Sequence, residues 1–467
     1  MSEYETENGT APAAGVDTIA AISTPAGRGG IGIVRLSGPE AASIVAQLVL
    51  LRAPLEHARA RLADVLDESG KDGEAERIDE AVVTYFAAPN SYTAEDVVEI
   101  AAHGSPVVLD LLLRRALALG ARLAEPGEFT QRAFLAGKLD LTQAEAVRDL
   151  IDAQTLTQAR QAASQMGGAL SRRVLPLKQQ LVELIALLEA GIDFAEDDVD
   201  VTPGEEIARQ IAEIDPALAA LEASFARGRI VHDGLTLAIV GRPNAGKSSL
   251  FNRLVERERA IVTATPGTTR DLVTERIAIE GIPLELVDTA GLHEGREEAE
   301  QIGIERSREA FADAALVLIV LDATQELNDE ERALLTAAED RAAIVALNKC
   351  DLAADGAMSG LQAEMPLQRT SALTGEGIAE LRVRIVALAT GGAAAEPGPL
   401  TSLRHQKAIA AARAALADAA QANANAIPHE MILIDLYRGL WALDSLTGQT
   451  TADDILNLIF STFCIGK

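Results

Sequence analysis

Cysteine is almost absent from this chain of 467 residues, and the two present, Cys350 and Cys464, lie far apart in the sequence. Two isolated cysteines exclude a disulfide framework and fit a protein kept in a reducing compartment. The N-terminal stretch MSEYETENGTAPAAG is acidic and polar, and it lacks the basic and apolar regions of a secretory signal. No run of about 18 apolar residues occurs, so we expect a cytoplasmic protein that makes no membrane contact.

Basic residues are also scarce, with 41 Lys and Arg against 70 Asp and Glu and a net charge of −29. A field of this sign repels nucleic acid at long range, so any RNA contact must come from a local basic patch or from a partner protein. Aromatic residues make up only 3% of a chain that is 48% hydrophobic. Aliphatic residues therefore supply most of the cores, which favours helix-rich packing, and the length allows two or three domains.

The most specific motif lies between Leu235 and Leu250, LTLAIVGRPNAGKSSL. A β-favouring run leads into GRPNAGKS, which matches the phosphate-loop pattern G-x-x-x-x-G-K-[ST] and opens an expected helix over 248–254. Backbone N–H groups of such a loop wrap the phosphates, Lys247 reaches the β- and γ-phosphates, and the Ser248 hydroxyl ligates Mg²⁺. The nucleotide-binding residues expected from this loop are Asn244, Ala245, Gly246, Lys247, Ser248 and Ser249.

Three later stretches indicate that the nucleotide is GTP. A strand over 284–287 ends in Asp288-Thr289-Ala290-Gly291, where the carboxylate can hold Mg²⁺ through water and the Gly291 N–H can sense the γ-phosphate. A strand over 343–347 ends in Asn348-Lys349-Cys350-Asp351, whose last carboxylate matches the paired N–H donors of guanine that adenine lacks. Ser371-Ala372-Leu373 follows a third short strand, where GTPases place a backbone N–H against guanine O6. In this order the motifs predict GTP binding and hydrolysis.

Changes in hydrophobic periodicity divide the chain into expected domains. Residues 1–135 alternate strands and helices and predict an α+β domain, and residues 136–232 show long helical periodicity. Residues 233–390 carry the nucleotide motifs and predict a Ras-like P-loop GTPase domain of α/β type. Helical periodicity resumes within 391–467. The GTPase domain is therefore expected as an insertion into a helical domain, so that its movements act on both halves of that domain.

Individual elements are expected as follows. In the first domain, strands cover 18–22, 31–36, 81–86 and 97–100, and helices cover 39–51 and 107–119. The loop before the second strand matches the dinucleotide fingerprint G-x-G-x-x-G formally, but that fingerprint opens a helix, whereas β-branched residues follow here at once. We therefore reject it. In the helical segments, breaks are expected at Gly167-Gly168 and at Pro176, and a helix runs from Pro203 to about Arg227.

Several stretches resemble one family, the tRNA modification GTPase MnmE, also called TrmE. They are Gly27 to Arg35 (GRGGIGIVR), Glu99 with His103-Gly104, Pro126 to Leu141 (PGEFTQRAFLAGKLDL), Gly267 to Asp271 (GTTRD) and the terminal Phe463 to Lys467 (FCIGK). The resemblance spans nearly the whole chain, and the FCIGK ending is especially specific. It implies a folate-binding-like N-terminal domain that forms a homodimer and binds a tetrahydrofolate derivative, 5-formyl- or methylene-tetrahydrofolate. It also implies an FAD-dependent partner of the MnmG type, in a heterotetramer or larger complex, and an aminomethyl-type substituent installed at C5 of the wobble uridine of tRNA.

The resemblance assigns a folate site to residues far apart in the sequence. It implies that Arg35, Glu99 and Lys138 line this site and that the C-terminal Lys467 reaches into it. Cations there suit the acceptor-rich glutamate tail and ring carbonyls of a folate. Without the family, each of these residues fits an ordinary surface position. Cys464 stands at the family's position for a functionally required thiol, with a buried small hydrophobic residue as the alternative.

The hydrolysis mechanism has a gap, because Leu292 stands where Ras-like enzymes place the Gln that positions the attacking water. The resemblance implies instead a K⁺ ion that offsets charge developing between the β- and γ-phosphates, completed when two GTPase domains pair across the nucleotide. Glu300 aligns with the family's water-orienting glutamate, and a solvated acid is its alternative. His293 stands where the family has Arg and introduces a group that titrates near neutral pH. The implied K⁺ ligands are Asn244 and the loop Thr263, Ala264, Thr265, Pro266, Gly267 and Thr268, and Thr269 is the second protein ligand of Mg²⁺.

Two other functions share part of these features. A GTPase switch in ribosome assembly would carry the same nucleotide motifs but neither the N-terminal domain nor the Cys464–Lys467 tail. A folate-dependent one-carbon transferase with a regulatory GTPase domain would turn folate over without tRNA or a partner. The resemblance favours a potassium-activated GTPase that modifies tRNA, with Lys247, Asn244, Glu300 and Cys464 as the candidates for direct roles in the chemistry.

Overall fold

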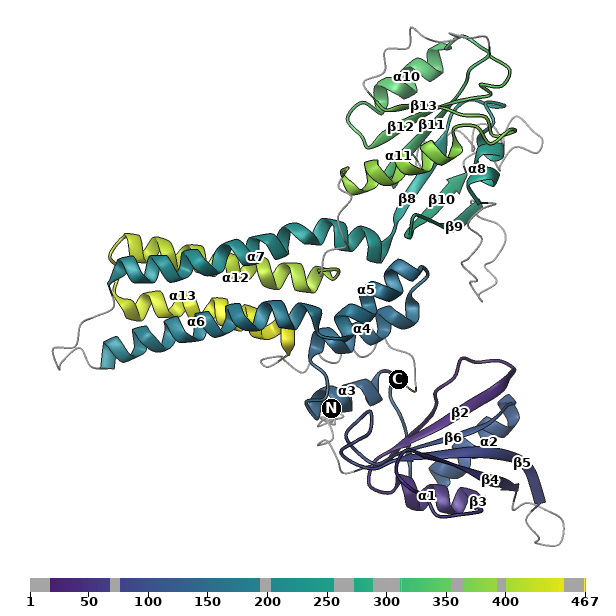
Figure 1. The fold of residues 1–467 in the computed structure, drawn as a ribbon, viewed down its shortest axis with the longest axis vertical. Coiled ribbons are helices and arrows are strands. Elements are labelled where there is room, and N and C mark those ends of the chain that lie inside the picture. The colour runs from purple at the N-terminus through teal and green to yellow at the C-terminus, as the bar shows by residue number, and fades with distance from the viewer. Residues whose placement is uncertain are drawn as a thin grey trace, which may run out of the picture. The chain divides into compact units, whose positions relative to one another are not determined.

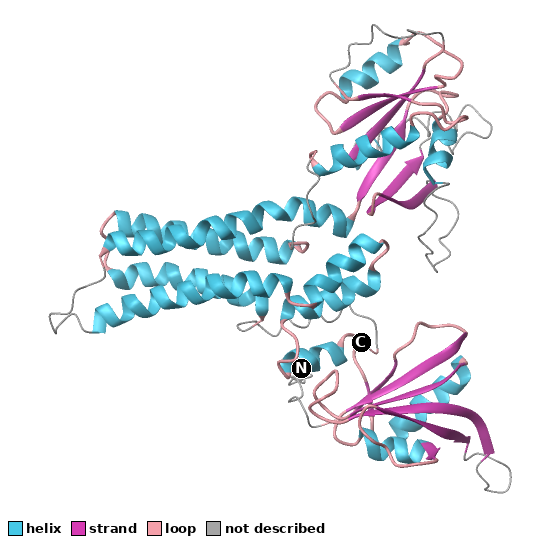
Figure 2. Cartoon of the chain, viewed as in Figure 1, coloured by secondary structure: helices cyan, strands magenta, loops and turns pink. Residues whose placement is uncertain are grey.

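The computed structural model describes residues 17–67, 76–193, 203–255, 273–288, 311, 313–353, 365–392, 400–448 and 466. The chain divides into two compact units, one of Met1–Arg148 with Asp444–Lys467 and one of Asp149–Leu443. Helices and strands are both abundant (Figure 2). Among the described residues, no helix is long and apolar enough to cross a membrane.

The first unit contains a seven-stranded sheet with the strand order β3-β4-β5-β6-β2-β1-β7 (Figure 1). All its strand pairs are antiparallel except β1 with β7, which run parallel. Its strands are β1 (Ile19–Ile22), β2 (Gly29–Ser37), β3 (Val49–Leu51), β4 (Arg59–Asp67), β5 (Glu76–Phe86), β6 (Val97–Gly104) and β7 (Arg122–Leu123). Its helices are α1 (Ala41–Leu48), α2 (Pro106–Ala118) and α3 (Glu128–Leu135), followed by the start of α4 (Leu141–Asp152) and the end of α13 (His429–Thr447).

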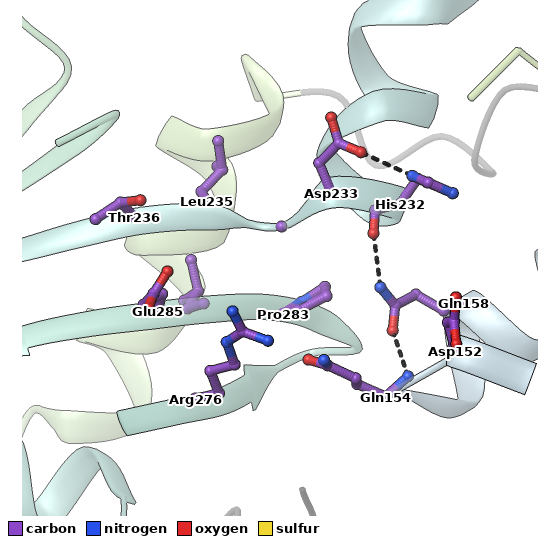
Figure 3. Close-up of a pocket in the computed structure, with 12 residues that line it drawn as sticks. Asp152, Gln154, Gln158, His232, Asp233, Leu235, Thr236, Arg276, Pro283 and Glu285 are labelled. Atoms are coloured by element: carbon purple, nitrogen blue, oxygen red, sulfur yellow. Dashed lines mark hydrogen bonds and ion pairs between the residues drawn. The ribbon is translucent and has the colours of Figure 1, made fainter. Parts of the chain in front are cut away.

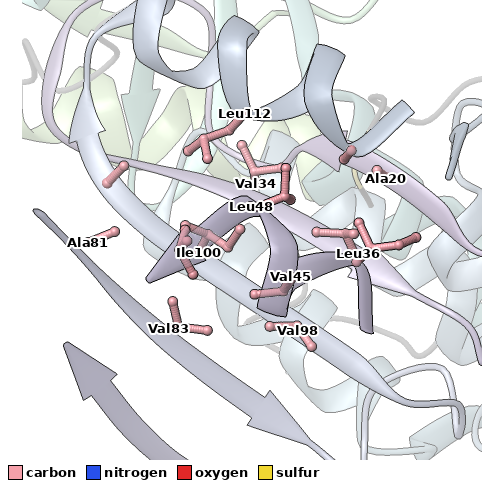
Figure 4. Close-up of a cluster of buried hydrophobic side chains, with 14 of the residues drawn as sticks. Ala20, Val34, Leu36, Val45, Leu48, Ala81, Val83, Val98, Ile100 and Leu112 are labelled. Carbon is pink, nitrogen blue, oxygen red and sulfur yellow. The ribbon is translucent and has the colours of Figure 1, made fainter. Parts of the chain in front are cut away.

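One face of this sheet carries the core of the unit. Strand side chains alternate between the two faces, so every second residue of a strand points to the same side. Leu48 of α1 and Leu112 of α2 pack on the covered face (Figure 4). The strand residues buried there include Val34 and Leu36 of β2, Ala81 and Val83 of β5, and Val98 and Ile100 of β6. On the other face, the cross-strand partners Leu62 and Val82 are 49% and 39% exposed.

The first unit departs from the sequence prediction at three places. The expected helix over 39–51 ends at Leu48, because the following residues pair as the edge strand β3 with β4. Strands β3, β4 and β7 were not expected at all. Strand β6 continues through His103 to Gly104, whereas the prediction ended it at Ile100. The strands expected over 18–22, 31–36 and 81–86 and the helix over 107–119 are confirmed, with shifts at their ends.

The second unit begins with long helices that pack along one another. Helix α7 packs against both α6 and α12 (Figure 1). The helices are α5 (Leu156–Met166), α6 (Ala169–Asp193), α7 (Gly204–Asp233), α12 (Leu403–Ala424) and the first part of α13. The predicted break at Gly167-Gly168 is confirmed between α5 and α6, but the break at Pro176 is wrong because α6 runs through it. Packing against neighbouring helices offsets the one hydrogen bond that a proline removes.

The same unit contains a six-stranded sheet with the order β13-β12-β11-β8-β10-β9. Every pair is parallel except β9 with β10, which form a hairpin. The elements are β8 (Leu235–Val240), α8 (Lys247–Val255), β9 (Val273–Ile279), β10 (Ile282–Asp288), β11 (Leu316–Asp322), α10 (Asp329–Ala337), β12 (Ala343–Asn348), β13 (Leu367–Arg369) and α11 (Ile378–Thr390). Because the carboxyl ends of β8, β11 and β12 share one edge, this sheet brings the predicted nucleotide motifs together, as parallel α/β sheets do for their ligands.

Candidate functional site: a phosphate loop, a guanine-type edge and an arginine cluster

The phosphate loop leaves β8 and enters α8 as its sequence predicts. Lys247 is 7% exposed, and its ammonium donates to the carbonyls of Gly241 at 2.8 Å and Arg242 at 2.9 Å. A Cβ on Gly246 would overlap the amide of Asn348, and its φ of +94° favours glycine. The loop thus concentrates a buried positive charge among backbone groups. A polyphosphate supplies the matching negative charge, so these residues fit the predicted nucleotide.

The guanine motif and the third loop lie directly against the phosphate loop. The Asn348 amide donates to the Ala245 carbonyl at 3.0 Å and accepts from the Ala372 N–H at 3.0 Å. Arg253 of α8 donates to the carbonyls of Ala372 at 3.1 Å and Leu373 at 2.8 Å. The structure therefore brings three motifs that are separated in the sequence together at one edge of the sheet, as the prediction of a guanine-nucleotide site requires. We call this group of motifs the nucleotide edge.

The remaining residues of this edge differ in exposure. Asp351, the acid expected to face guanine, is exposed, as are Ser248 and Ser249 in the first turn of α8. Ser371 is buried, and its hydroxyl accepts from the Thr374 N–H at 3.1 Å. Cys350 is also buried, and burial raises the pKa of its thiol. The thiol therefore behaves as a packing group beneath the edge.

The loops expected to surround the γ-phosphate and the metal ions lie outside the described residues. These are Thr263, Ala264, Thr265, Pro266, Gly267, Thr268 and Thr269, then Thr289, Ala290, Gly291, Leu292 and His293, and finally Glu300. Asp288 is described by its backbone only, as the last residue of β10. Within the described part of the chain, no group of three or more His, Cys, Asp or Glu could hold a metal ion.

A second cluster, in the first unit, forms around Arg35 on β2. The guanidinium contacts Glu99 Oε1 of the neighbouring strand at 2.8 Å and donates to the carbonyl of Gly466 at 3.2 Å. Its carbon lies 6.0 Å from the ring centre of Tyr92 and 5.6 Å from that of Phe129. The structure thus unites two predicted folate-site residues, Arg35 and Glu99, with the C-terminal tail. Cys464 and Lys467 lie outside the described residues.

Lys138, the third predicted member of that cluster, has a different environment. It follows α3, and its ammonium donates to the carbonyl of Pro89 at 3.1 Å. Pro89 follows the end of β5 and precedes Tyr92 in the same loop. Lys138 is therefore bonded to the loop that carries Tyr92, one of the two aromatic residues near Arg35.

Sequence reasoning missed a buried ionic network behind this cluster. Arg132 of α3, 7% exposed, contacts Glu95 at 3.1 Å, Asp17 at 2.8 Å and Glu128 at 2.9 Å. Burial alone would raise the pKa of Glu128, but bonds from Arg122, the Glu125 amide and Arg132 outweigh it and leave the pKa lowered. The i,i+4 spacing of Glu128 and Arg132 was a signal for their pairing. The network fixes α3, which presents Phe129 to Arg35.

A cavity of about 270 Å³ lies in the second unit, where helices meet the hairpin β9–β10 (Figure 3). The Gln158 amide donates to the His232 carbonyl at 2.8 Å, and the Thr155 hydroxyl donates to the Gly281 carbonyl at 2.9 Å. His232 pairs with Asp149 at 3.3 Å and Asp233 at 2.7 Å. Its pKa rises to about 9, chiefly through the bond to Asp149. The residues lining the cavity are Asp152, Gln154, Gln158, His232, Asp233, Gly234, Leu235, Thr236, Arg276, Pro283, Leu284 and Glu285.

Beside this cavity, the start of α5 contacts the hairpin turn and the end of α7. We call this group of contacts the hairpin joint and define it by Thr155, Thr157, Gln158, His232 and Gly281. It links the first turn of α5 to the turn of the β9–β10 hairpin, and it links the same helix to the end of α7. Thr155 and Gln158 form a capping box, in which each side chain bonds the backbone of the other. Of the two capping residues of α5, Thr155 therefore also bonds the hairpin and Gln158 also bonds the end of α7.

Comparisons with known proteins show which family the chain is similar to. Family models match the chain over residues 141–464, described as the MnmE helical domain, and over residues 18–138, described as the GTP-binding protein TrmE N-terminus. The tRNA modification GTPase MnmE of Koribacter versatilis is 58% identical over 97% of this chain and 99% of its own length. The corresponding protein of Aquifex aeolicus is 40% identical over 97% of this chain and 100% of its own. Among solved structures, the G domain of the T. maritima FeoB iron transporter is 30% identical over 33% of this chain and 98% of its own, with a TM-score of 0.25.

Proposed function

The chain belongs to the family of tRNA modification GTPases called MnmE, and from this we propose that it is a potassium-activated GTPase that drives folate-dependent modification of tRNA. With an FAD-dependent protein partner, it installs an aminomethyl-type substituent at C5 of the wobble uridine. The observation that carries the proposal is the Arg35 cluster of the first unit, which offers charged and aromatic groups for a ligand other than the nucleotide. A plain GTPase switch has no use for such a site.

The nucleotide edge supports GTP binding with Mg²⁺ and K⁺. Lys247 holds its ammonium at the loop that receives the β- and γ-phosphates, and Ser248 offers a hydroxyl oxygen in the first turn of α8. Asn244 has a φ of +61°, a left-handed conformation that is uncommon for residues with a side chain. Its carbonyl accepts from Lys349 at 2.7 Å, which holds this conformation. The side-chain oxygen of Asn244 would ligate a K⁺ ion, whose bound charge would offset that of the transferring phosphate.

The Arg35 cluster supports folate binding. The Arg35 guanidinium can bind the glutamate tail through charge, and the two aromatic rings near it can stack on the flat pterin. The carbonyl of Gly466 bonds Arg35, so Lys467, the next residue, extends the chain from a point that is already in the cluster. The tail therefore supports a folate role for Lys467 and a place near the chemistry for Cys464.

An apolar row on the face of the first sheet opposite α1 and α2 supports a homodimer. Leu62 and Val82 pair across β4 and β5, and the same row continues through Ala101 to Ile33. The row exposes apolar surface on a face opposite the helices α1 and α2. A second copy is the partner that a self-complementary apolar face fits best.

Because the net charge of −29 repels RNA, contact with tRNA requires a local basic surface or the flavoprotein partner.

The hairpin joint supports coupling between GTP hydrolysis and the helices. Strand β9 begins at Val273, two residues after the GTTRD stretch that ends at Asp271, and β10 ends at Asp288, where the second phosphate loop begins. A movement of either loop therefore acts on a hairpin whose turn is bonded to Thr155 of α5. This path carries a change at the γ-phosphate into the helical part of the unit.

Folate binding by Arg35 tests the proposal. We expect Arg35→Met to weaken the binding of 5-formyl-tetrahydrofolate about tenfold or more in titration calorimetry, because it removes a charge-assisted hydrogen bond and a cation–π contact. Arg59→Met is the matched control, since Arg59 also pairs with a carboxylate beside the same sheet, that of Glu56. Both variants and a deletion of Lys467 should hydrolyse GTP at the wild-type rate, while Arg35→Met and the deletion should lose tRNA modification.

Three outcomes would contradict the proposal. A wild-type chain that binds no folate would favour a GTPase switch in ribosome assembly. Folate turnover without tRNA or a partner would favour a one-carbon transferase with a regulatory GTPase domain. Equal loss of GTP hydrolysis and tRNA modification on deletion of Lys467 would refute a folate role for the tail.

A further inference from the structure

Two buried carboxylates behind the phosphate loop belong to none of the nucleotide motifs. Asp322 is the last residue of β11, and Glu331 lies in the first turn of α10. Their side chains are 1% and 3% exposed. A carboxylate this deeply buried is stable only with cations and hydrogen-bond donors around it. The partners of these two groups therefore indicate what they do.

Both carboxylates hold cations that touch the nucleotide edge. Lys349 of the guanine motif bridges two groups, since its ammonium lies 2.7 Å from Asp322 Oδ2 and donates to the Asn244 carbonyl at 2.7 Å. Arg242, within the phosphate loop, has its Nε 3.3 Å from Glu331 Oε1 and its Nη2 4.0 Å from Asp322 Oδ2. The two acids thus act on Arg242 directly and on Asn244 through Lys349, at two positions of the phosphate loop.

Asp322 is itself oriented before it meets Lys349. Its Oδ1 accepts from the Thr324 N–H at 2.9 Å and from the Thr324 hydroxyl at 2.6 Å. These two bonds hold the carboxylate in the orientation in which its other oxygen, Oδ2, faces Lys349. Burial would raise the pKa of Asp322, but the bonds from Lys349 and Thr324 lower it, so the carboxylate stays charged. A lysine has a flexible stem and no fixed direction of its own, so Asp322 determines where the Lys349 ammonium lies.

We propose that Asp322 and Glu331 are positioning residues for nucleotide binding, which fix the phosphate loop through Lys349 and Arg242 before GTP arrives. Asn244 holds a left-handed conformation that the Lys349 bond stabilises, so the loop would relax without this support. A loop that already has its binding conformation loses little conformational entropy when the nucleotide binds, so the affinity for the nucleotide is higher. This inference rests on the proposed GTPase function. It adds to that function a physical link, through Lys349, between the guanine motif and the phosphate loop.

A double-mutant cycle on the full-length chain tests the pair. The dissociation rate of a fluorescent GDP analogue is measured for wild type, Asp322→Asn, Lys349→Met and the double variant. The asparagine amide keeps the size of the side chain but turns a donor toward the Lys349 ammonium. We expect each single variant to release GDP about tenfold faster or more, and the double variant to be no faster than Lys349→Met. The KM for GTP should rise in each single variant as well.

Thr324→Val is the matched control. It removes the hydroxyl that bonds Oδ1 but leaves the Thr324 N–H bond and the bridge from Oδ2 to Lys349, so it should speed GDP release far less than Asp322→Asn does. Glu331→Gln is a second, independent variant, because its amide oxygen still accepts the Asn328 N–H at the start of α10. It should release GDP faster than wild type by a smaller factor than Asp322→Asn, and it decides the matter if Asp322→Asn does not fold.

The outcomes separate this inference from the proposed function. Wild-type GDP release by Asp322→Asn, or effects of Asp322→Asn and Lys349→Met that multiply in the double variant, would overturn the positioning role while leaving the GTPase intact. A wild-type chain that does not bind GDP at all would overturn both. Thr324→Val releasing GDP as fast as Asp322→Asn would show that packing around Asp322, and not its bond to Lys349, controls the loop.

Discussion

The hairpin joint makes a quantitative prediction through Gly281. Its φ is +82°, and a Cβ placed there would overlap Thr157 Oγ1 and lie 2.9 Å from Thr157 Cβ. Gly392 has nearly the same φ, +80°, and none of the described atoms lies within 4 Å of its Cβ position. Gly281→Ala and Gly392→Ala therefore share the same backbone strain, and only the first alters the joint.

The expected magnitudes follow from these distances. A left-handed alanine costs about 1 to 2 kcal/mol at either position. At Gly281, overpacking against Thr157 adds roughly 1 to 3 kcal/mol, because either the hairpin turn or the first turn of α5 must move. The difference between the two variants isolates the joint, and it corresponds to a change of roughly fivefold to 150-fold in the local opening equilibrium.

Amide hydrogen exchange measures that difference where it arises. The Gln158 N–H bonds Thr155 Oγ1 at 3.1 Å, and the Ala159 N–H bonds the Thr155 carbonyl at 3.0 Å. We expect these two amides to exchange faster in Gly281→Ala than in Gly392→Ala by the factor above, with GTP hydrolysis retained and tRNA modification reduced in Gly281→Ala alone. Equal exchange in the two variants would refute the reasoning, and full tRNA modification by Gly281→Ala would refute the coupling path.

Two further predictions concern charge and metal. The pKa of His232 rises from 6.5 to about 9, so its ion pairs stabilise the fold fully below pH 6.5 and lose this effect as the pH passes through 9. Because the side chain is 32% exposed, screening reduces the contribution to about 1 to 2 kcal/mol; denaturation from pH 7 to 10 should show that extra loss in wild type and not in His232→Asn. For Asn244→Ala, we expect potassium stimulation of GTP hydrolysis, measured against sodium at equal ionic strength, to disappear; retained stimulation would contradict Asn244 as a K⁺ ligand.

Much of the nucleotide edge could be predicted because its motifs constrain the backbone directly. The pattern around Lys247 requires a strand, a tight turn and a helix, and the structure has β8, the loop and α8 in that order. The strand ends at Asp288 and Asn348 also fall within one residue of the predicted ends. At these positions the local sequence preference and the needs of nucleotide binding favour the same backbone conformation. One sequence is therefore sufficient to predict both the element and its role.

Prediction failed where pairing or packing decided the element. Residues 49–51 continue a helical pattern, yet they form β3 because β4 offers a partner. Pro176 is a strong local signal for a break, yet α6 continues through it because neighbouring helices stabilise both of its sides. Both errors have the same cause, since interactions distant in sequence outweighed a local preference of a few kcal/mol at most.

The sequence alone identified the GTPase motifs of this protein, because each motif is a short run of residues whose pattern predicts its own local conformation. Only the tertiary structure showed which residues distant in the sequence bond to one another. Arg35 and Gly466 bond across 431 positions, and Thr155 and Gly281 across 126. Asp322 is an ordinary strand-end acid until the fold places Lys349 beside it. Such interactions depend on three-dimensional proximity that no local pattern encodes, and they decide how the sites are held and linked.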